Sequence, residues 1–124
     1  MPTAEAIIAA VENYLKTVAS GPASAIAALY AEDATLEDPV GSEPHRGRAA
    51  IEQFYAGIAA YRLETELLTV RVAGPNAAFH FLVRSYADGT VIDTEPIDVM
   101  AFDENAQITS MRAFWSEADI RVRD

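Results

Sequence analysis

The spacing of the apolar residues changes near residue 61, and this change limits the folds that the chain can adopt. Before residue 61, apolar residues recur at three- and four-residue steps, as on one face of an amphipathic helix. After it, β-branched, aliphatic and aromatic residues fill segments that short turn signals separate, as in strands. Helices followed by a run of strands predict an α+β domain.

The first half of the chain predicts three helices. Thr3 is a candidate N-cap for the first. Its apolar face is formed by Ile7, Ile8, Val11, Tyr14, Leu15 and Val18. Gly21-Pro22 should end this helix, because glycine accepts the left-handed conformation and proline cannot continue a helix. Proline can, however, start the next helix. A second helix carries Ile26, and a third follows Gly47.

Strands are expected at 33–38, 63–72, 77–86, 90–102 and 107–116. Asp88-Gly89 is a strong hairpin signal between two of them. The simplest architecture is a curved sheet wrapped around the three helices. Such a cone leaves a pocket between sheet and helices, where ligands usually bind.

Length, charge and residue content exclude several classes of function. The 124 residues suffice for one domain, 1–124, with its own core. The formal charge of −10 at pH 7 disfavours binding to nucleic acids or to anionic membranes, because both would repel the chain. Cysteine is absent and the two histidines are far apart in sequence, so we expect neither disulfides nor a dedicated zinc site. We expect a cytoplasmic protein with a small-molecule partner.

Asp98 occupies an unusual position for an acid. The other residues of segment 96–102 are apolar, and alternation along a strand places Asp98 on the same face as Met100 and Phe102. Burial without a nearby cation raises the pKa of a carboxyl group, so a buried Asp98 would be a neutral hydrogen-bond donor. The alternative is an ion pair with Arg84 or Arg112 from a neighbouring strand.

Asp38 precedes Pro39, which disfavours helix at the aspartate. The carboxylate is therefore held on stiff backbone between apolar residues, as a general base requires. The alternative is a turn aspartate that caps a backbone amide.

Three tyrosines lie on inward faces of the predicted helices. Tyr14 is on the apolar face of the first helix, and Tyr30 and Tyr55 lie on the inner faces of the second and third. If their hydroxyl groups converge, each hydrogen bond polarises the next and strengthens the terminal donor. The alternative for Tyr14 is a core tyrosine that donates to a backbone carbonyl.

With these residues in order, the chain resembles the Δ5-3-ketosteroid isomerases of the NTF2-like superfamily. Residues 37–44, Glu-Asp-Pro-Val-Gly-Ser-Glu-Pro, are similar to the segment of the catalytic base. Residues 96–102 resemble the strand of a second acid, and 13–15, Asn-Tyr-Leu, take the place of an oxyanion-hole tyrosine. Residues 111–117 resemble the last strand. The resemblance runs nearly end to end and is weakest over 60–86.

The resemblance implies a fold and a reaction. The fold would be an α+β cone, with three N-terminal helices packed on a curved, mostly antiparallel sheet around an apolar pocket. The enzyme would convert 3-oxo-Δ5-steroids to 3-oxo-Δ4-steroids by intramolecular proton transfer, without a cofactor or metal. Asp38 would be the base, and Tyr14 and protonated Asp98 the oxyanion hole, supported by Tyr30 and Tyr55.

The resemblance also guides the expected contacts of the protein. Apolar side chains expected to touch the steroid are Phe54, Phe81, Met100, Met111 and Trp115. A homodimer through the outer face of the sheet is expected, because the strands after Leu63 carry apolar residues on both faces.

Two alternatives remain open at this point. One is another enzyme of the same fold, either polyketide-cyclase-like or epoxide-hydrolase-like. An epoxide hydrolase of this type would need an Asp–Arg–Asp cluster deep in the pocket. The other is a module that binds an apolar ligand or dimerises without catalysis, since a fold alone does not imply an activity.

Overall fold

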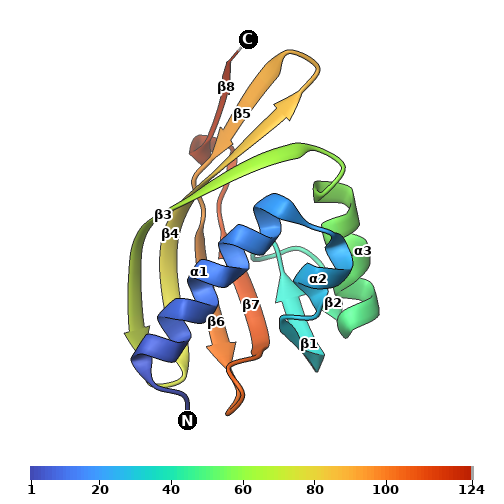
Figure 1. The fold of residues 1–124 in the computed structure, drawn as a ribbon. Coiled ribbons are helices and arrows are strands. Elements are labelled where there is room, and N and C mark those ends of the chain that lie inside the picture. The colour runs from blue at the N-terminus through green and yellow to red at the C-terminus, as the bar shows by residue number, and fades with distance from the viewer. Residues whose placement is uncertain (124) are drawn as a thin grey trace.

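A computed structural model describes residues 1–123, in which helices cover the inner face of a curved sheet (Figure 1). The helices are α1 (Ala4–Ser20), α2 (Ala23–Ala27) and α3 (Arg48–Ile58). The strands are β1 (Tyr30–Glu37), β2 (His45–Arg46), β3 (Arg62–Ala73), β4 (Asn76–Ala87), β5 (Thr90–Thr94), β6 (Ile97–Phe102), β7 (Ile108–Phe114) and β8 (Ile120–Arg123). A short 3-10 helix, η1 (Glu117–Asp119), precedes β8.

The sheet is mostly antiparallel, as expected. Its strands follow the order β2-β1-β7-β6-β4-β5-β8, and β3 pairs with β4. Only the β1–β7 pair is parallel within residues 1–123. On the edge away from β3, β4 pairs with two strands. Its first half pairs with β6 and its second half with β5.

The prediction of one continuous strand over 90–102 is wrong. Glu95-Pro96 separates β5 from β6. Proline has no backbone N–H to donate to a ladder, so a strand that pairs on both sides cannot run through it. β8 was not predicted either. Its four residues alternate between aliphatic and arginine side chains and none of them is buried, so the sequence carries little signal there.

The predicted ends of the first helix are confirmed. The Oγ1 atom of Thr3 accepts a hydrogen bond of 3.1 Å from the amide of Ala6. Gly21 follows the helix with φ 63°, in the left-handed region that glycine accepts without a steric penalty. The hairpin signal is confirmed as well, because Asp88 and Gly89 both have positive φ and join β4 to β5.

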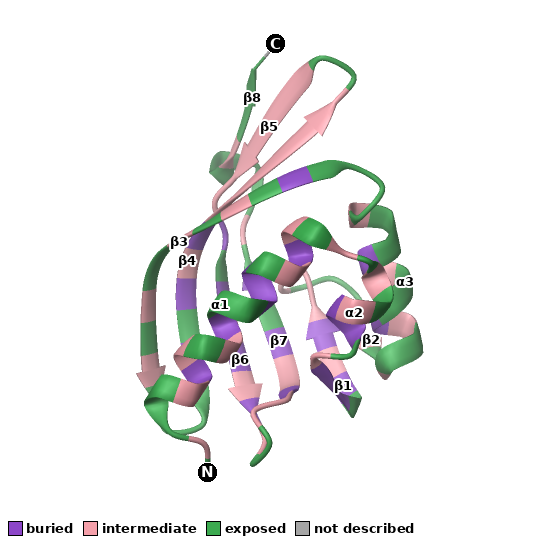
Figure 2. Cartoon of the chain, in the orientation of Figure 1, coloured by how far each residue is buried: buried purple, intermediate pink, exposed green. Residues whose placement is uncertain are grey.

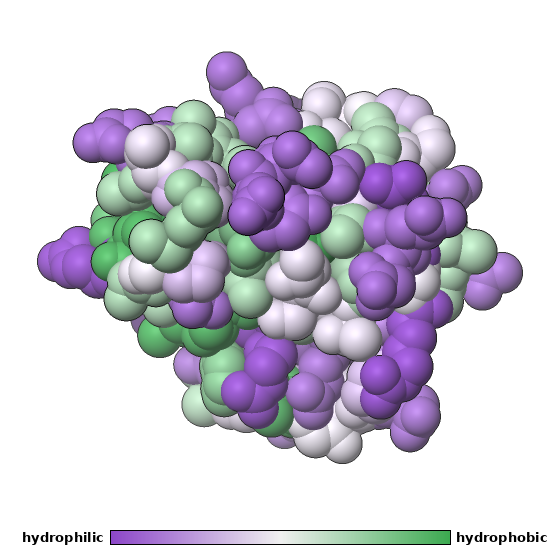
Figure 3. All heavy atoms as spheres, turned by 90° about the horizontal axis from the view of Figure 1, so that it is seen from below, coloured by the Kyte–Doolittle hydropathy of each residue, from purple (hydrophilic) through white to green (hydrophobic). Residues whose placement is uncertain are grey.

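The core lies between α1 and the sheet. Figure 2 shows buried residues along the side of α1 that faces the strands, whereas β5 and β8 carry none. The surface seen from below is mostly hydrophilic, with hydrophobic side chains gathered on one side (Figure 3). No helix of residues 1–123 is long and apolar enough to cross a membrane. Core side chains thus cover the lower part of the inner face of the sheet. The upper part of that face is left to line a pocket.

Candidate active site

A cavity of about 320 Å³ lies between the sheet and the helices α1 and α3. Its wall is largely apolar and includes the three predicted acid–base groups Tyr14, Asp38 and Asp98. The remaining lining residues are Val18, Phe54, Tyr55, Ile58, Phe81, Val83, Ser85, Thr94, Pro96, Ala113 and Trp115. The structure thus brings together side chains from the first helix, the turn after β1 and the start of β6.

Asp98 is buried in the centre of the sheet. It pairs with Phe79 of β4 on one side and with Ala113 of β7 on the other. Only 2% of the residue is exposed, and its Oδ1 atom has no hydrogen-bond partner within residues 1–123. Burial raises the pKa of Asp98 well above the usual value for a carboxyl group, and the nearby Asp38 raises it further. These surroundings favour the neutral acid, which is an O–H donor.

The alternative ion pair of Asp98 with an arginine is not formed. Arg84 instead donates to Asp93, with Nε 2.8 Å from Oδ1. Arg112 pairs with Glu37 on the outer face of the sheet, at 3.5 Å. Both guanidinium groups are occupied by acids other than Asp98.

Asp38 lies just after β1, where the chain leaves the sheet. The indole N–H of Trp115 donates to its Oδ1 atom. Burial raises the pKa of Asp38, whereas the hydrogen bond from Trp115 and the nearby His45 lower it. In this turn Glu37, not Asp38, accepts a hydrogen bond from a backbone amide, that of Gly41. Asp38 is therefore free to face the cavity with one oxygen held.

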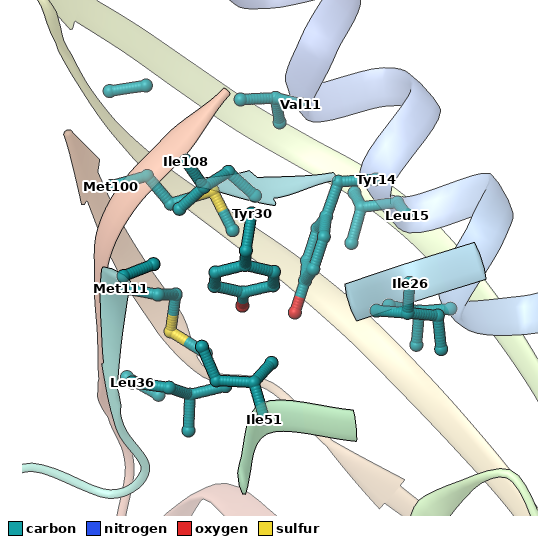
Figure 4. Close-up of a cluster of buried hydrophobic side chains, with 14 of the residues drawn as sticks. Val11, Tyr14, Leu15, Ile26, Tyr30, Leu36, Ile51, Met100, Ile108 and Met111 are labelled. Carbon is teal, nitrogen blue, oxygen red and sulfur yellow. The ribbon is translucent and has the colours of Figure 1, made fainter. Parts of the chain in front are cut away.

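The three tyrosine hydroxyl groups converge, as predicted, but the placement of Tyr30 on the second helix is wrong, because α2 ends at Ala27 and Tyr30 begins β1. The hydroxyl of Tyr55 lies 2.8 Å from that of Tyr14 and 2.6 Å from that of Tyr30. Figure 4 shows the rings of Tyr14 and Tyr30 side by side with their hydroxyl groups at the same end. Burial raises the pKa of all three phenols. When Tyr30 donates to Tyr55 and Tyr55 donates to Tyr14, Tyr14 keeps its own proton for a ligand.

Three of the five apolar side chains expected at the pocket wall lie there: Phe54, Phe81 and Trp115. The expectation for Met100 and Met111 needs correction. These two residues pair across β6 and β7 and belong to the buried core (Figure 4). Met100 and Met111 point to the same inward face of the sheet as Asp98. Core side chains cover that face around the two methionines, and the cavity lies over it only around Asp98.

The sequence analysis missed several lining residues. Val83 and Ser85 lie two and four positions beyond Phe81 on β4, so alternation from a predicted pocket residue could have found them. Thr94 faces the cavity because it pairs with Val83. The two-residue hairpin at Asp88-Gly89 sets this register, so counting back from the hairpin could have found Thr94 as well. Within residues 1–123, no three His, Asp or Glu side chains gather as they would around a metal ion.

Comparisons with known proteins show the family to which the chain belongs. Residues 11–111 match the model of the SnoaL-like domain family. Over 114 residues the chain is 57% identical to a steroid Delta-isomerase from Nocardioides simplex, and the match spans 92% of this chain and 93% of that protein.

Two solved structures have a similar fold. The structure of SalBIII, described as an epoxide hydrolase/cyclase-like enzyme with a role in pyran ring formation in the polyether salinomycin, has a TM-score of 0.92 and 26% identity. It covers 99% of this chain and 100% of its own. RV0760c from Mycobacterium tuberculosis has a TM-score of 0.88 and 20% identity, with the same coverage, and shares the fold.

Proposed function

Since the chain belongs to the SnoaL-like, NTF2-like family of the steroid Delta-isomerases, we propose that it converts 3-oxo-Δ5-steroids to 3-oxo-Δ4-steroids. The predicted family and α+β fold are thereby confirmed. The observation that carries the proposal is that Tyr14, Asp38 and the unpartnered Asp98 line one apolar cavity.

Asp38 is the general base in this proposal. The proton on C4, between the ketone and the double bond, is far less acidic than a carboxylic acid. When it passes to Asp38, the electron pair moves into the ring system and places negative charge on the C3 oxygen as a dienolate. The same carboxyl group then returns the proton to C6, and the double bond becomes conjugated with the ketone. Because Trp115 holds Oδ1 of Asp38, the other oxygen is free to carry the proton between the two carbons.

Tyr14 and Asp98 stabilise the negative charge on the C3 oxygen. A weak base can remove such a proton only when the enolate is stabilised as it forms, and preorganised donors in a dry cavity do this. The raised pKa of Asp98 supports its role as a neutral donor. The hydrogen bond between Tyr14 and Tyr55 supports the role of Tyr14, because it fixes the position of the phenol.

The two alternatives have weaker support. An epoxide hydrolase of this fold would need an arginine between two acids, but within residues 1–123 no arginine lines the cavity. A module that only binds an apolar ligand has no use for Asp98, whose burial without a partner costs folding free energy.

A direct test is to incubate the purified protein with a 5-ene-3-ketosteroid and follow ultraviolet absorbance. Conversion to the 4-ene conjugates the double bond with the ketone and produces a new band. An Asp38→Asn variant serves as the matched control. No new band with the wild-type protein would overturn the proposed reaction.

We also propose that the protein is a homodimer formed through the outer face of the sheet. Ile97 and Phe114 pair directly across β6 and β7 and are 47% and 42% exposed. Beside them the Nε2 atom of His80 lies 3.0 Å from the Oε1 atom of Glu95. A second copy would remove this apolar strip from water. Sedimentation at micromolar concentration should give a dimer for the wild type and a shift to monomer for Phe114→Glu. A wild-type monomer would contradict the proposal.

A further inference from the structure

The upper end of the cavity contains two hydroxyl groups that the proposed reaction does not use. Ser85 of β4 and Thr94 of β5 both line the cavity. Neither side chain forms a hydrogen bond with another residue in the part of the chain that the structure describes. Val18 and Ile58 contribute apolar side chains to the helical wall of the same cavity. Two free donors in such a wall indicate a ligand that carries an acceptor.

The strand register places the two hydroxyl groups together. Thr94 pairs with Val83, and Ser85 pairs with Ile92, so Ser85 and Thr94 are diagonal neighbours on one face of adjacent strands. Diagonal residues on a sheet are roughly 7–8 Å apart, and their Cβ atoms are somewhat closer. An acceptor placed between the two hydroxyl groups is then within hydrogen-bond distance of both.

The same register separates them from the reacting end of the cavity. Asp98 pairs with Phe79 of β4, and Val83 lies four positions further along that strand. At ~3.3 Å per residue, the row of Val83 and Thr94 lies about 13 Å from the row of Asp98. Ser85 lies a further two positions away. This separation fits the length of a four-ring steroid whose C3 oxygen lies at Tyr14 and Asp98.

We propose that Ser85 and Thr94 form a polar subsite for an oxygen at the far end of the steroid, on C17. The assignment rests on the proposed function, since it assumes that the C3 ketone lies at Asp98. The hydroxyl groups donate to a 17-oxo group, which takes the place of water. A substrate with only hydrogen or an alkyl chain at C17 removes that water without replacing its hydrogen bonds, and such a loss lowers affinity. The subsite therefore selects steroids that are oxygenated at both ends.

The test compares two 5-ene-3-ketosteroids, one with a 17-oxo group and one without. The measured quantity is the ratio of their KM values, for the wild type, Thr94→Val, Ser85→Ala and the double variant. Thr94→Val keeps the shape of the side chain and removes its hydroxyl group. We expect each single variant to reduce the preference for the 17-oxo substrate about two- to tenfold, the range of one hydrogen bond. kcat for the 17-oxo substrate should change less than KM.

Two matched controls separate hydrogen bonding from packing. Thr94→Ser keeps the hydroxyl group and loses a methyl group, so it should retain the preference. Thr90→Val removes a hydroxyl group from the same strand but outside the cavity lining, and it should leave the ratio at the wild-type value. An equal preference in the wild type and the double variant, at similar melting temperatures, would overturn the subsite.

A binding measurement keeps this inference separate from the proposed reaction. Phenolic steroids with and without a 17-oxo group cannot be isomerised, and their affinities can be measured by fluorescence. If the protein turns over neither ketosteroid, the proposed reaction fails whatever the subsite does. If it turns over both but binds the two phenols equally well, the reaction stands and the subsite fails.

Discussion

The turn after β1 and the start of β6 each place a carboxyl group in the same cavity, but the two places affect the pKa of that group differently. At the turn, an indole N–H reaches Asp38, and this bond and the nearby His45 partly offset the effect of burial on its pKa. In β6, Oδ1 of Asp98 has no hydrogen-bond partner among residues 1–123, and the neighbouring Asp38 adds to the effect of burial. The same side chain can thus be a base in one place and a donor in the other.

The backbone explains this difference. β6 lies between β4 and β7, and both neighbours use their backbone amides in ladder hydrogen bonds, so no amide is free for the carboxyl group of Asp98. Asp38 lies where the chain has left the sheet, within reach of a side chain from the segment after β7. The centre of a sheet is therefore a suitable place for a neutral acid, and its end is a suitable place for an ionised one.

The largest expected effect is that of Asp38→Asn. The amide cannot accept the C4 proton, and loss of a general base typically lowers kcat by about 10²–10⁴-fold. A phenolic steroid should bind as well as before or more tightly, because a neutral side chain no longer faces the anionic ligand. Steady-state kinetics and a fluorescence titration measure the two quantities. A parallel loss of binding and turnover would indicate a structural role for Asp38.

A graded series at Asp98 tests the other half of the comparison. Asp98→Asn still donates and should retain much of the activity, whereas Asp98→Ala admits water and should be slower. Asp98→Leu removes the donor and blocks water, so it should lose about 10²–10³-fold in kcat, the usual effect of one oxyanion donor. Turnover is measured beside melting temperature. Equal losses in all three variants that follow stability would contradict the role of a neutral donor.

Trp115→Phe should make the surroundings of Asp38 more like those of Asp98. Asp38 accepts a proton only when ionised, so activity is present above its pKa and lost below it. Removing the indole donor raises this pKa, and the acid limb of kcat/KM should move to higher pH by roughly one unit or more. A loss of the same size at every pH would show that Trp115 contributes only packing.

The last expected effect concerns stability and leaves turnover aside. The pKa of Asp98 is higher in the folded chain than in the unfolded one, so the folded state keeps a proton that the unfolded state releases. Stability is therefore lost as pH rises above about 4, by about 1.4 kcal/mol per unit until the folded pKa is reached. Asp98→Asn does not titrate, so its melting temperature should gain on that of the wild type between pH 5 and pH 7. A constant difference would show that Asp98 is ionised when folded.

Local patterns in the sequence predicted a good part of this site. Helical periodicity placed Tyr14 and Tyr55 inward, and strand alternation placed Asp98 among apolar residues. The contact between Trp115 and Asp38 was not predicted, because it depends on how two segments far apart in sequence meet. Thr94 was missed for another reason, because the Asp88-Gly89 hairpin sets the register of β5 with β4 but not which part of β4 faces a cavity. Periodicity assigns a residue to a face, but it does not say what covers that face.

The break at Glu95-Pro96 has a consequence for how such a protein can diverge. It separates β6, which carries Asp98 and other buried side chains, from β5, none of whose residues is buried. Apart from Asp93, which bonds Arg84 and Arg123, mutations in β5 therefore cost little folding free energy, while those in β6 disturb the core. Descendants of this chain could acquire new steroid preferences through β5 while inheriting the same chemistry unchanged.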